Sequence, residues 1–235
     1  MKRILSLLRR AVQDFNMIKP GDRIAAGLSG GKDSIALLHA LKRFQYFSPT
    51  PFELEAITLT MGMDDPDLSP LINLCKDLKV PYTIKETKIG RIVFDVRREK
   101  NPCSLCANMR RGALHNAALE RNCNKVALGH HKDDVIETFL LSLMYEGRLN
   151  TFMPVTYLTR KKITLIRPLI YAGEREIAGL SEKYNFPVVK NPCPASGRTK
   201  RQYVKELVSC LEKDIPDIRE KILGAIKNKD ARRLW

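Results

Sequence analysis

Apolar residues along this chain alternate between two spacings, and the alternation predicts the order of its elements. The first 15 residues carry apolar side chains at the spacing of an amphipathic helix: Ile4, Leu7, Leu8, Val12 and Phe15. A short apolar run at 24–28 then predicts a buried strand. Helical spacing returns at 35–44, so residues 29–33 should form a turn between a strand and a helix.

The same alternation continues through most of the chain. We expect further strands at about 53–60, 82–87, 125–129, 163–167 and 187–190, and helices at about 67–79, 104–122, 133–145 and 174–184. Strands that alternate with helices predict an α/β fold with a doubly wound parallel sheet, with the last two strands at its far edge. Residues 199–228 are helical and basic. We therefore expect one domain over residues 1–195 and a basic helical extension over residues 196–235.

Composition and charge narrow the class of protein. With 44% hydrophobic residues in 235, the chain can close one good-sized core, which excludes disordered and collagen-like classes. No stretch approaches the roughly 18 apolar residues of a membrane span, and Arg9 and Arg10 interrupt the apolar start before it could act as a secretory signal. We expect a cytoplasmic protein that does not bind membranes.

The net charge of +15 favours a polyanionic partner. Basic residues gather at the start of the chain, after Cys193 and near the end: Lys2, Arg3, Arg9, Arg10; Arg198, Lys200, Arg201, Lys205; Lys221, Lys227, Lys229, Arg232, Arg233. Any one group could be a solvated helix face. All three together, flanking one domain, favour contact with the phosphate backbone of a nucleic acid, and a single-stranded loop offers a base that can be splayed out into a pocket.

The first turn carries the pattern of a phosphate-binding loop: Ser29, Gly30, Gly31, Lys32, Asp33 and Ser34. Glycines allow a close approach to phosphate oxygens, and amides at a helix start point at the anion. This is not a Walker A loop, because Asp33 follows the lysine where that motif has Ser or Thr. A carboxylate beside phosphates needs a bridging divalent ion, so Asp33 indicates Mg²⁺. The alternative is an ordinary polar turn, and Thr58, at the end of the next strand, could lie beside an adenine or on a plain sheet edge.

A second loop, residues 129–134, follows the strand predicted at 125–129. It reads Gly-His-His-Lys-Asp-Asp and should face the first loop across the carboxyl edge of the sheet. Acidic residues at a helix start can cap that helix. Two histidines and two acids next to a phosphate site also suit metal positioning and proton handling.

Six cysteines in a reducing compartment suggest metal or redox chemistry rather than disulfides. Cys103 and Cys106 form a CxxC pair at a helix start, and Cys193 stands in a second Asn-Pro-Cys setting. Three thiolates with an open position fit a catalytic zinc or a [4Fe-4S] cluster, and a thioredoxin-like pair is a third option. The other three, Cys75, Cys123 and Cys210, are typical of buried or helical cysteines.

Taken together, these motifs resemble the tRNA 2-thiocytidine synthetase family of the N-type ATP pyrophosphatases. The likeness covers about residues 20–195 and includes the SGGKDS loop, the PCSLC segment followed by Arg110-Arg111-Gly112, the GHHKDDVIET string, and the run 166–169. The resemblance implies ATP with Mg²⁺ at residues 29–34, and a [4Fe-4S] cluster on Cys103, Cys106 and Cys193.

Roles for single residues follow from the same resemblance. Lys32 would stabilise phosphate charge, Asp133 would orient metal or move protons, and Arg110 would steady the sulfur or the adenylate. Gly129 and His130 would contact the nucleotide. The reaction implied is ATP-dependent replacement of a C2 oxygen, in an anticodon-loop cytidine of tRNA, by sulfur. The sulfur would come from a cysteine desulfurase or from free sulfide, and a homodimer is an open option.

Two other classes fit parts of the pattern. One is an adenylating tRNA enzyme of the same fold, lysidine-type or amidotransferase-like, with structural zinc on the cysteines. The other is a non-enzymatic nucleotide-binding or RNA-binding module.

Thr60-Met61-Gly62 stands where typical family members carry an acid, and Pro194-Ala195 follows the third cysteine in place of a Gly-Ser-Gln-like stretch.

Overall fold

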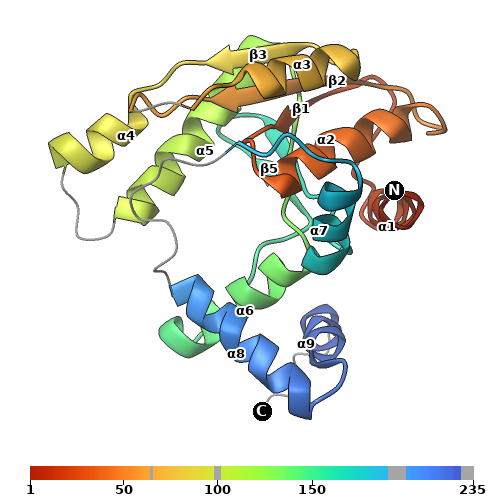
Figure 1. The fold of residues 1–235 in the computed structure, drawn as a ribbon, viewed down its shortest axis with the longest axis vertical. Helices are drawn as coiled ribbons and strands as arrows, with labels where there is room; N and C mark the ends of the chain where they lie inside the picture. Colours follow the sequence, from red (N-terminus) through yellow and green to blue (C-terminus); the bar gives the residue numbers. More distant parts are fainter. Residues whose placement is uncertain (64–65, 98–101, 190–199, 229–235) are drawn as a thin grey trace.

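The six strands of the described residues form one sheet, which lies in the upper part of the view in Figure 1. The computed structural model describes residues 1–63, 66–97, 102–189 and 200–228. The order across the sheet is β3-β2-β1-β4-β6-β5. The strands are β1 (Asp22–Gly27), β2 (Phe52–Leu59), β3 (Tyr82–Lys85), β4 (Lys125–Ala127), β5 (Val155–Leu158) and β6 (Ile163–Ile166). The expectation of a doubly wound α/β fold is confirmed.

The strand pairs are parallel except at one edge. β1 lies between β2 and β4, so the winding reverses beside it. β5 pairs with β6 in the antiparallel sense and forms the edge. The sequence prediction of a far-edge strand at 187–190 is wrong for residues 187–189, which are not in a strand, and residue 190 lies outside the described residues. Because the winding reverses beside β1, the phosphate loop that follows β1 lies at the switch point, where open α/β sheets bind ligands.

Helices cover both faces of the sheet (Figure 1). The helices before the sheet's last strands are α1 (Lys2–Asp14), α2 (Lys32–Gln45), α3 (Ser69–Asp77), α4 (Ile89–Arg91), its π-helical continuation η1 (Ile92–Arg97), α5 (Pro102–Glu120) and α6 (Lys132–Glu146). Those after them are α7 (Glu174–Lys183), α8 (Lys200–Asp214) and α9 (Ile218–Lys227). The sequence does not predict the helix over 89–97, because this segment has no strong apolar period.

The two faces of β1 show how alternation builds the layers. Ile24 and Ala26 point into the larger core, with the apolar faces of α1, α2 and α7. Ala25 points the other way and packs with Ala117 and Ala118 of α5. Because successive strand residues face opposite sides, a run that is apolar at every position is buried on both faces.

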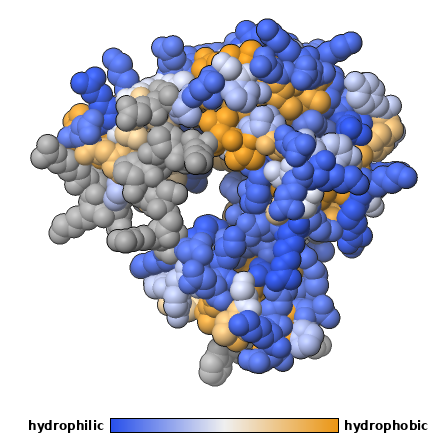
Figure 2. Space-filling view, viewed as in Figure 1, coloured by the Kyte–Doolittle hydropathy of each residue, from blue (hydrophilic) through white to orange (hydrophobic). Residues whose placement is uncertain are grey.

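A smaller helical lobe lies next to the carboxyl edge of the sheet, below it in the view of Figure 1. It consists of α6, α8 and α9, held together by Ile136, Val204 and Val208 (Figure 1). Figure 2 shows the molecule hollowed between this lobe and the sheet, and the visible surface of the lobe is mainly hydrophilic. The helical character expected over 199–228 is confirmed for the described residues 200–228, which form two helices that separate where Pro216 precedes Asp217, a residue with φ of +60°. None of the described helices is long and apolar enough to cross a membrane.

Candidate active site

The glycine turn after β1 is built to leave its backbone accessible. Gly30 has a φ of +84°, and a Cβ there would lie 3.0 Å from the Cβ of Val189. Both the conformation and the space therefore require glycine. The hydroxyl of Ser34 donates to the carbonyl of Gly31 at 2.8 Å and accepts from the amide of Ser29 at 3.1 Å. These bonds close the loop on itself at the start of α2, where the amides of Lys32 and Asp33 precede the first hydrogen bond of the helix.

Lys32 and Asp33 lie side by side at this loop. The ammonium of Lys32 is 3.1 Å from Oδ1 of Asp33 and 3.2 Å from Oε1 of Glu174. Burial would lower the pKa of Lys32, but these two carboxylates outweigh burial and raise it. Oδ1 of Asp33 is buried and accepts no hydrogen bond from the described residues. A hard carboxylate oxygen whose described contacts are ionic, beside the amides at the start of α2, fits Mg²⁺ held together with phosphate.

The second loop meets the first. A Cβ at Gly129 would lie 3.0 Å from the backbone carbonyl carbon of Asp33, so the two loops approach backbone to backbone. Nε2 of the buried His131 lies 3.8 Å from Oδ1 of Asp33. This contact confirms that the two motifs face one another, as expected for loops that follow neighbouring parallel strands.

The two acids of the second loop have different tasks. Asp134 accepts a hydrogen bond from the amide of His131 at 3.0 Å, which caps α6. Asp133 is buried, and both its oxygens have partners: Oδ1 is 2.5 Å from Nη1 of Arg219, and Oδ2 accepts from the amide of Glu174 at 2.6 Å. Asp133 therefore joins α6 to α7 and α9 in this structure.

His130 is partly buried and lies beside Arg167, which belongs to the run 166–169. Nε of Arg167 donates to Nδ1 of His130 at 3.2 Å, which assigns the ring proton to Nε2. Burial above all, with Arg167 nearby, lowers the pKa of His130 to about 4. The imidazole is therefore neutral at pH 7 and able to donate one hydrogen bond to a ligand.

Glu174 links the site to the helical lobe. Besides Lys32, its carboxylate accepts from Nζ of Lys205, on α8, at 2.7 Å. Burial would raise the pKa of Glu174, but Lys205 and Lys32 lower it to about 2. Arg201, also on α8, donates to Glu137 at 3.0 Å. Two basic residues that the sequence assigned to a nucleic-acid surface thus pair with acids around the site.

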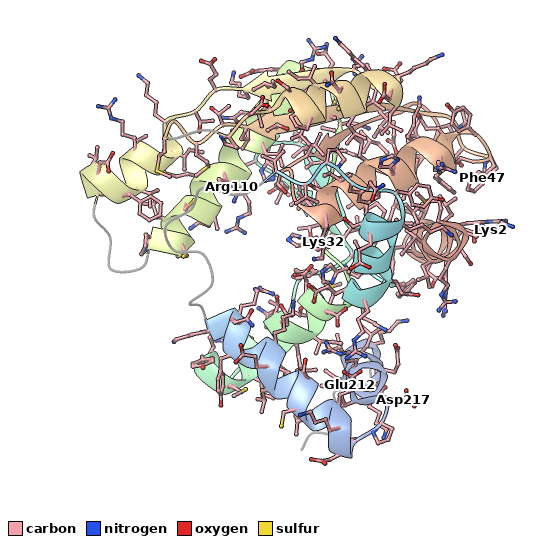
Figure 3. The ribbon with its side chains drawn as sticks, viewed as in Figure 1. Lys2, Lys32, Phe47, Arg110, Glu212 and Asp217 are labelled. Carbon is pink, nitrogen blue, oxygen red and sulfur yellow. The ribbon has the colours of Figure 1, made fainter. Side chains whose placement is uncertain are left out.

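Thr58 and Arg110 lie at the edges of this arrangement. The hydroxyl of Thr58 is buried, donates to the carbonyl of Leu28 at 2.6 Å and accepts from Tyr82 at 2.8 Å, so it is already engaged within the protein. Arg110 is exposed on α5. In the view of Figure 3, Arg110 and Lys32 lie on opposite sides of the opening seen in Figure 2.

Two of the three predicted metal-binding cysteines are described. Cys103 is exposed and Cys106 half-buried, in the first turns of α5 and three residues apart, which places both thiols toward one side of the helix. Cys193 lies outside the described residues, and within those residues there is no group of three metal-binding side chains. A pair of soft donors fits iron–sulfur and zinc equally well, and both need further ligands.

Sequence reasoning missed Glu174, Arg219 and Arg167 as members of the site. Arg167 could have been found, because it directly follows β6 and so lies at the same edge as the two loops. Glu174 is 142 residues from Lys32, and Arg219 is 86 residues from Asp133. No local pattern indicates pairs at such separations.

Comparison with known proteins agrees with the fold and the loops. A family model described as the PP-loop domain matches residues 4–211. The U34-tRNA thiolase NcsA from Methanococcus maripaludis, solved with its [4Fe-4S] cluster, superposes with a TM-score of 0.79 at 25% identity, over 99% of this chain and 78% of that one. The NH3-dependent NAD synthetase from Campylobacter jejuni shares the fold, with a TM-score of 0.54 at 18% identity, over 99% of this chain and 94% of that one. Fold and site thus define a PP-loop protein.

Sequence relatives give the particular family. The tRNA-cytidine(32) 2-sulfurtransferase of Pelobacter propionicus is 39% identical over 99% of this chain and 88% of its own length. That of Geobacter sulfurreducens is 37% identical over 99% of this chain and 92% of its own. The chain belongs to the tRNA-cytidine(32) 2-sulfurtransferase family, and the resemblance inferred from its motifs is confirmed.

Proposed function

We propose that this protein uses ATP to activate the C2 oxygen of cytidine 32 in tRNA and replaces that oxygen with sulfur. One observation carries the proposal: the phosphate loop with Lys32 and Asp33 meets the second loop at the switch point of the sheet. The relatives named above have this activity by name and match nearly the whole chain.

ATP activation follows from the chemistry of the loop. The amides at the start of α2 would bind the departing pyrophosphate, and Lys32 would neutralise its charge. Asp33 would hold Mg²⁺, which when bound bridges the phosphates and shields their charge. The cytidine oxygen, a poor leaving group by itself, would leave as AMP once adenylated.

Sulfur delivery is assigned to the cysteines of α5. Cys103 and Cys106, with Cys193, would hold a [4Fe-4S] cluster through three thiolates. When bound, such a cluster offers one iron without a protein ligand, where the sulfur to be transferred can be carried. Arg110, two turns along the same helix, would steady the sulfur or the adenylate. Asp133 would orient the metal or move a proton, which requires it to give up Arg219.

The remaining parts of the proposal concern partners. Residues 196–235 would form a basic extension that contacts the tRNA backbone, and about five to eight phosphates engaged would make affinity fall steeply with salt. A cysteine desulfurase or free sulfide would supply sulfur, and two copies could form a homodimer. Work on tRNA would place the enzyme in the cytoplasm.

Mass spectrometry of nucleosides tests the function directly. Anaerobically purified protein is incubated with ATP, Mg²⁺, sulfide and an unmodified tRNA transcript, which is then digested. We expect 2-thiocytidine, equal release of AMP and pyrophosphate, and no product from a transcript with uridine at position 32. Thiolation at position 34, or attachment of an amino acid, would contradict the proposal. Analysis of iron and acid-labile sulfide in the same protein separates a cluster from structural zinc.

A further inference from the structure

Arg167 is a buried cation without a counterion in the described part of the chain. The residue is only 7% exposed. Its Nη1 donates to the carbonyl of Met153 at 2.6 Å and reaches Oγ1 of Thr156 at 3.4 Å, and Nε donates to His130. All these acceptors are neutral. No carboxylate of the described residues lies within ion-pair distance.

The other buried arginine and lysine contacts of the sheet follow the opposite rule. Lys125, a buried lysine of β4, lies 2.7 Å from the buried carboxylate of Asp22, and even the exposed Arg121 lies 2.6 Å from the buried carboxylate of Glu55. Burial, with some repulsion from Arg111, lowers the pKa of Arg167 to about 10, and at that value the guanidinium is still charged at pH 7. An unpaired buried charge is costly, so proteins keep one where a ligand completes it.

The guanidinium is held rigidly at the ligand-binding edge. It lies 4.7 Å from the centroid of the Phe152 ring, and the rings of Phe152 and His130 are 4.9 Å apart. Among the described residues, none accepts a hydrogen bond from Nη2, so one nitrogen of the fork is left for a ligand. Nη2 carries two N–H groups in the plane of the guanidinium, and both can donate to the oxygens of a phosphate.

The position of Arg167 separates this site from the phosphate loop. Arg167 follows β6, which is next to β4, and β4 is next to β1, whose end carries the loop. At about 4.8 Å between neighbouring strands, the ends of β1 and β6 are roughly 10 Å apart. A phosphate at Arg167 is therefore a different one from the pyrophosphate seated on the loop.

We propose that Arg167 anchors a second phosphate site, formed with His130 at the carboxyl ends of β4 and β6, which takes a singly substituted or diester phosphate of a substrate. The inference rests on the proposed function. The phosphate can belong to the α-position of the nucleotide or to the RNA backbone beside the target base. The chemistry is the same in both cases.

Binding measurements with two probes test the site and identify the source. ATP binding is followed by calorimetry, and binding of an unmodified tRNA transcript is followed at several salt concentrations. Arg167→Met is compared with Arg160→Met, which removes an exposed arginine from the turn between β5 and β6. We expect the Arg167 variant to lose about ten-fold in affinity for one probe, and the Arg160 variant to stay within about two-fold.

Each outcome has one meaning. Loss of ATP affinity alone assigns the nucleotide phosphate. Loss of tRNA affinity, with a salt slope smaller by about one, assigns the RNA phosphate. Wild-type affinity for both probes overturns the inference. If wild-type protein binds neither ATP nor tRNA, the proposed function has failed, and the inference, which rests on it, fails with it.

A second variant covers loss of folding. Where Arg167→Met does not reach the thermal midpoint of wild type, Arg167→Lys is used, because it keeps the charge and loses the planar fork. We expect this variant to keep the wild-type salt slope and to bind one probe about three-fold more weakly. Unchanged affinity for both probes in a folded Lys variant also overturns the inference.

Discussion

The ammonium of Lys32 lies 3.2 Å from Oε1 of Glu174, so a carboxylate from α7 pairs with the lysine of the phosphate loop. Glu174 also pairs with Lys205 of α8. The lysine is thus balanced by internal acids before any phosphate arrives, and its link continues into the helical lobe. A nucleotide that uses Lys32 must compete with Glu174.

Glu174→Gln should therefore tighten ATP binding. The change removes the competing charge from Lys32 and leaves the backbone amide of residue 174 available to Asp133. Because the pair is partly exposed, its loss should be worth about 1 kcal/mol or less, which is up to about five-fold in Kd. Calorimetry with ATP measures the effect. The matched control is Glu120→Gln. It removes an exposed acid at the end of α5, which pairs with Lys85 of β3. Weaker binding in Glu174→Gln would mean that the carboxylate positions the lysine rather than competes for it.

Arg219→Met should destabilise the protein strongly. The substitution leaves the buried carboxylate of Asp133 without its cation, and breaking a buried pair costs about 3 kcal/mol or more. Urea unfolding followed by circular dichroism gives the change in the free energy of unfolding. The double variant Asp133→Asn with Arg219→Met removes both charges and should recover most of the loss. Equal stability of single and double variants would show that the pair contributes little.

The sheet and its two ligand loops could be predicted from sequence because their signals are local. A glycine turn that follows an apolar run, and a helical period that follows the turn, lie within about 20 residues of one another. β5 was missed because it has four residues and Tyr157, at its centre, is 59% exposed. An edge strand of this kind lacks the apolar run of a buried one.

The run at 187–189 predicts a strand because it is apolar, but these residues are not in a strand. The structure uses it differently: the amide of Val189 donates to the carbonyl of Gly30 at 3.0 Å, so the run covers the phosphate loop instead of joining the sheet. In the site, the residues of each loop could be named in advance, but their partners could not. Lys32 with Glu174, and Asp133 with Arg219, meet only after the chain has folded.

The stability of the protein should depend on His130 between pH 6.5 and pH 4. Its pKa is lowered from 6.5 to about 4 in the folded state, so the unfolded chain binds the proton first as the pH falls. Stability is therefore full above pH 6.5 and decreases toward pH 4, by up to about 3 kcal/mol from this residue. His130→Asn keeps an acceptor for Arg167 and has no titration in this range. Urea unfolding at pH 7 and pH 4.5 should give a smaller difference for the variant than for wild type. Because His39 and His115 are present in both proteins, their contributions cancel.

Cysteine substitutions should separate the metal centre from the nucleotide site. Cys103 and Cys106 lie at the start of α5, whereas the phosphate loop follows β1, so their loss should not change the loop. We expect Cys103→Ala, Cys106→Ala and Cys193→Ala each to lose the visible absorption of an iron–sulfur cluster and the formation of 2-thiocytidine, with ATP affinity within about two-fold of wild type. Cys210→Ala, which removes an exposed cysteine of α8, is the matched control and should keep both.

A Cys193→Ala variant that retains the cluster would exclude this cysteine as a ligand, and loss of zinc rather than iron would favour the structural-zinc alternative. Retained adenylation with lost thiolation would show that ATP activation and sulfur transfer depend on different groups of one site.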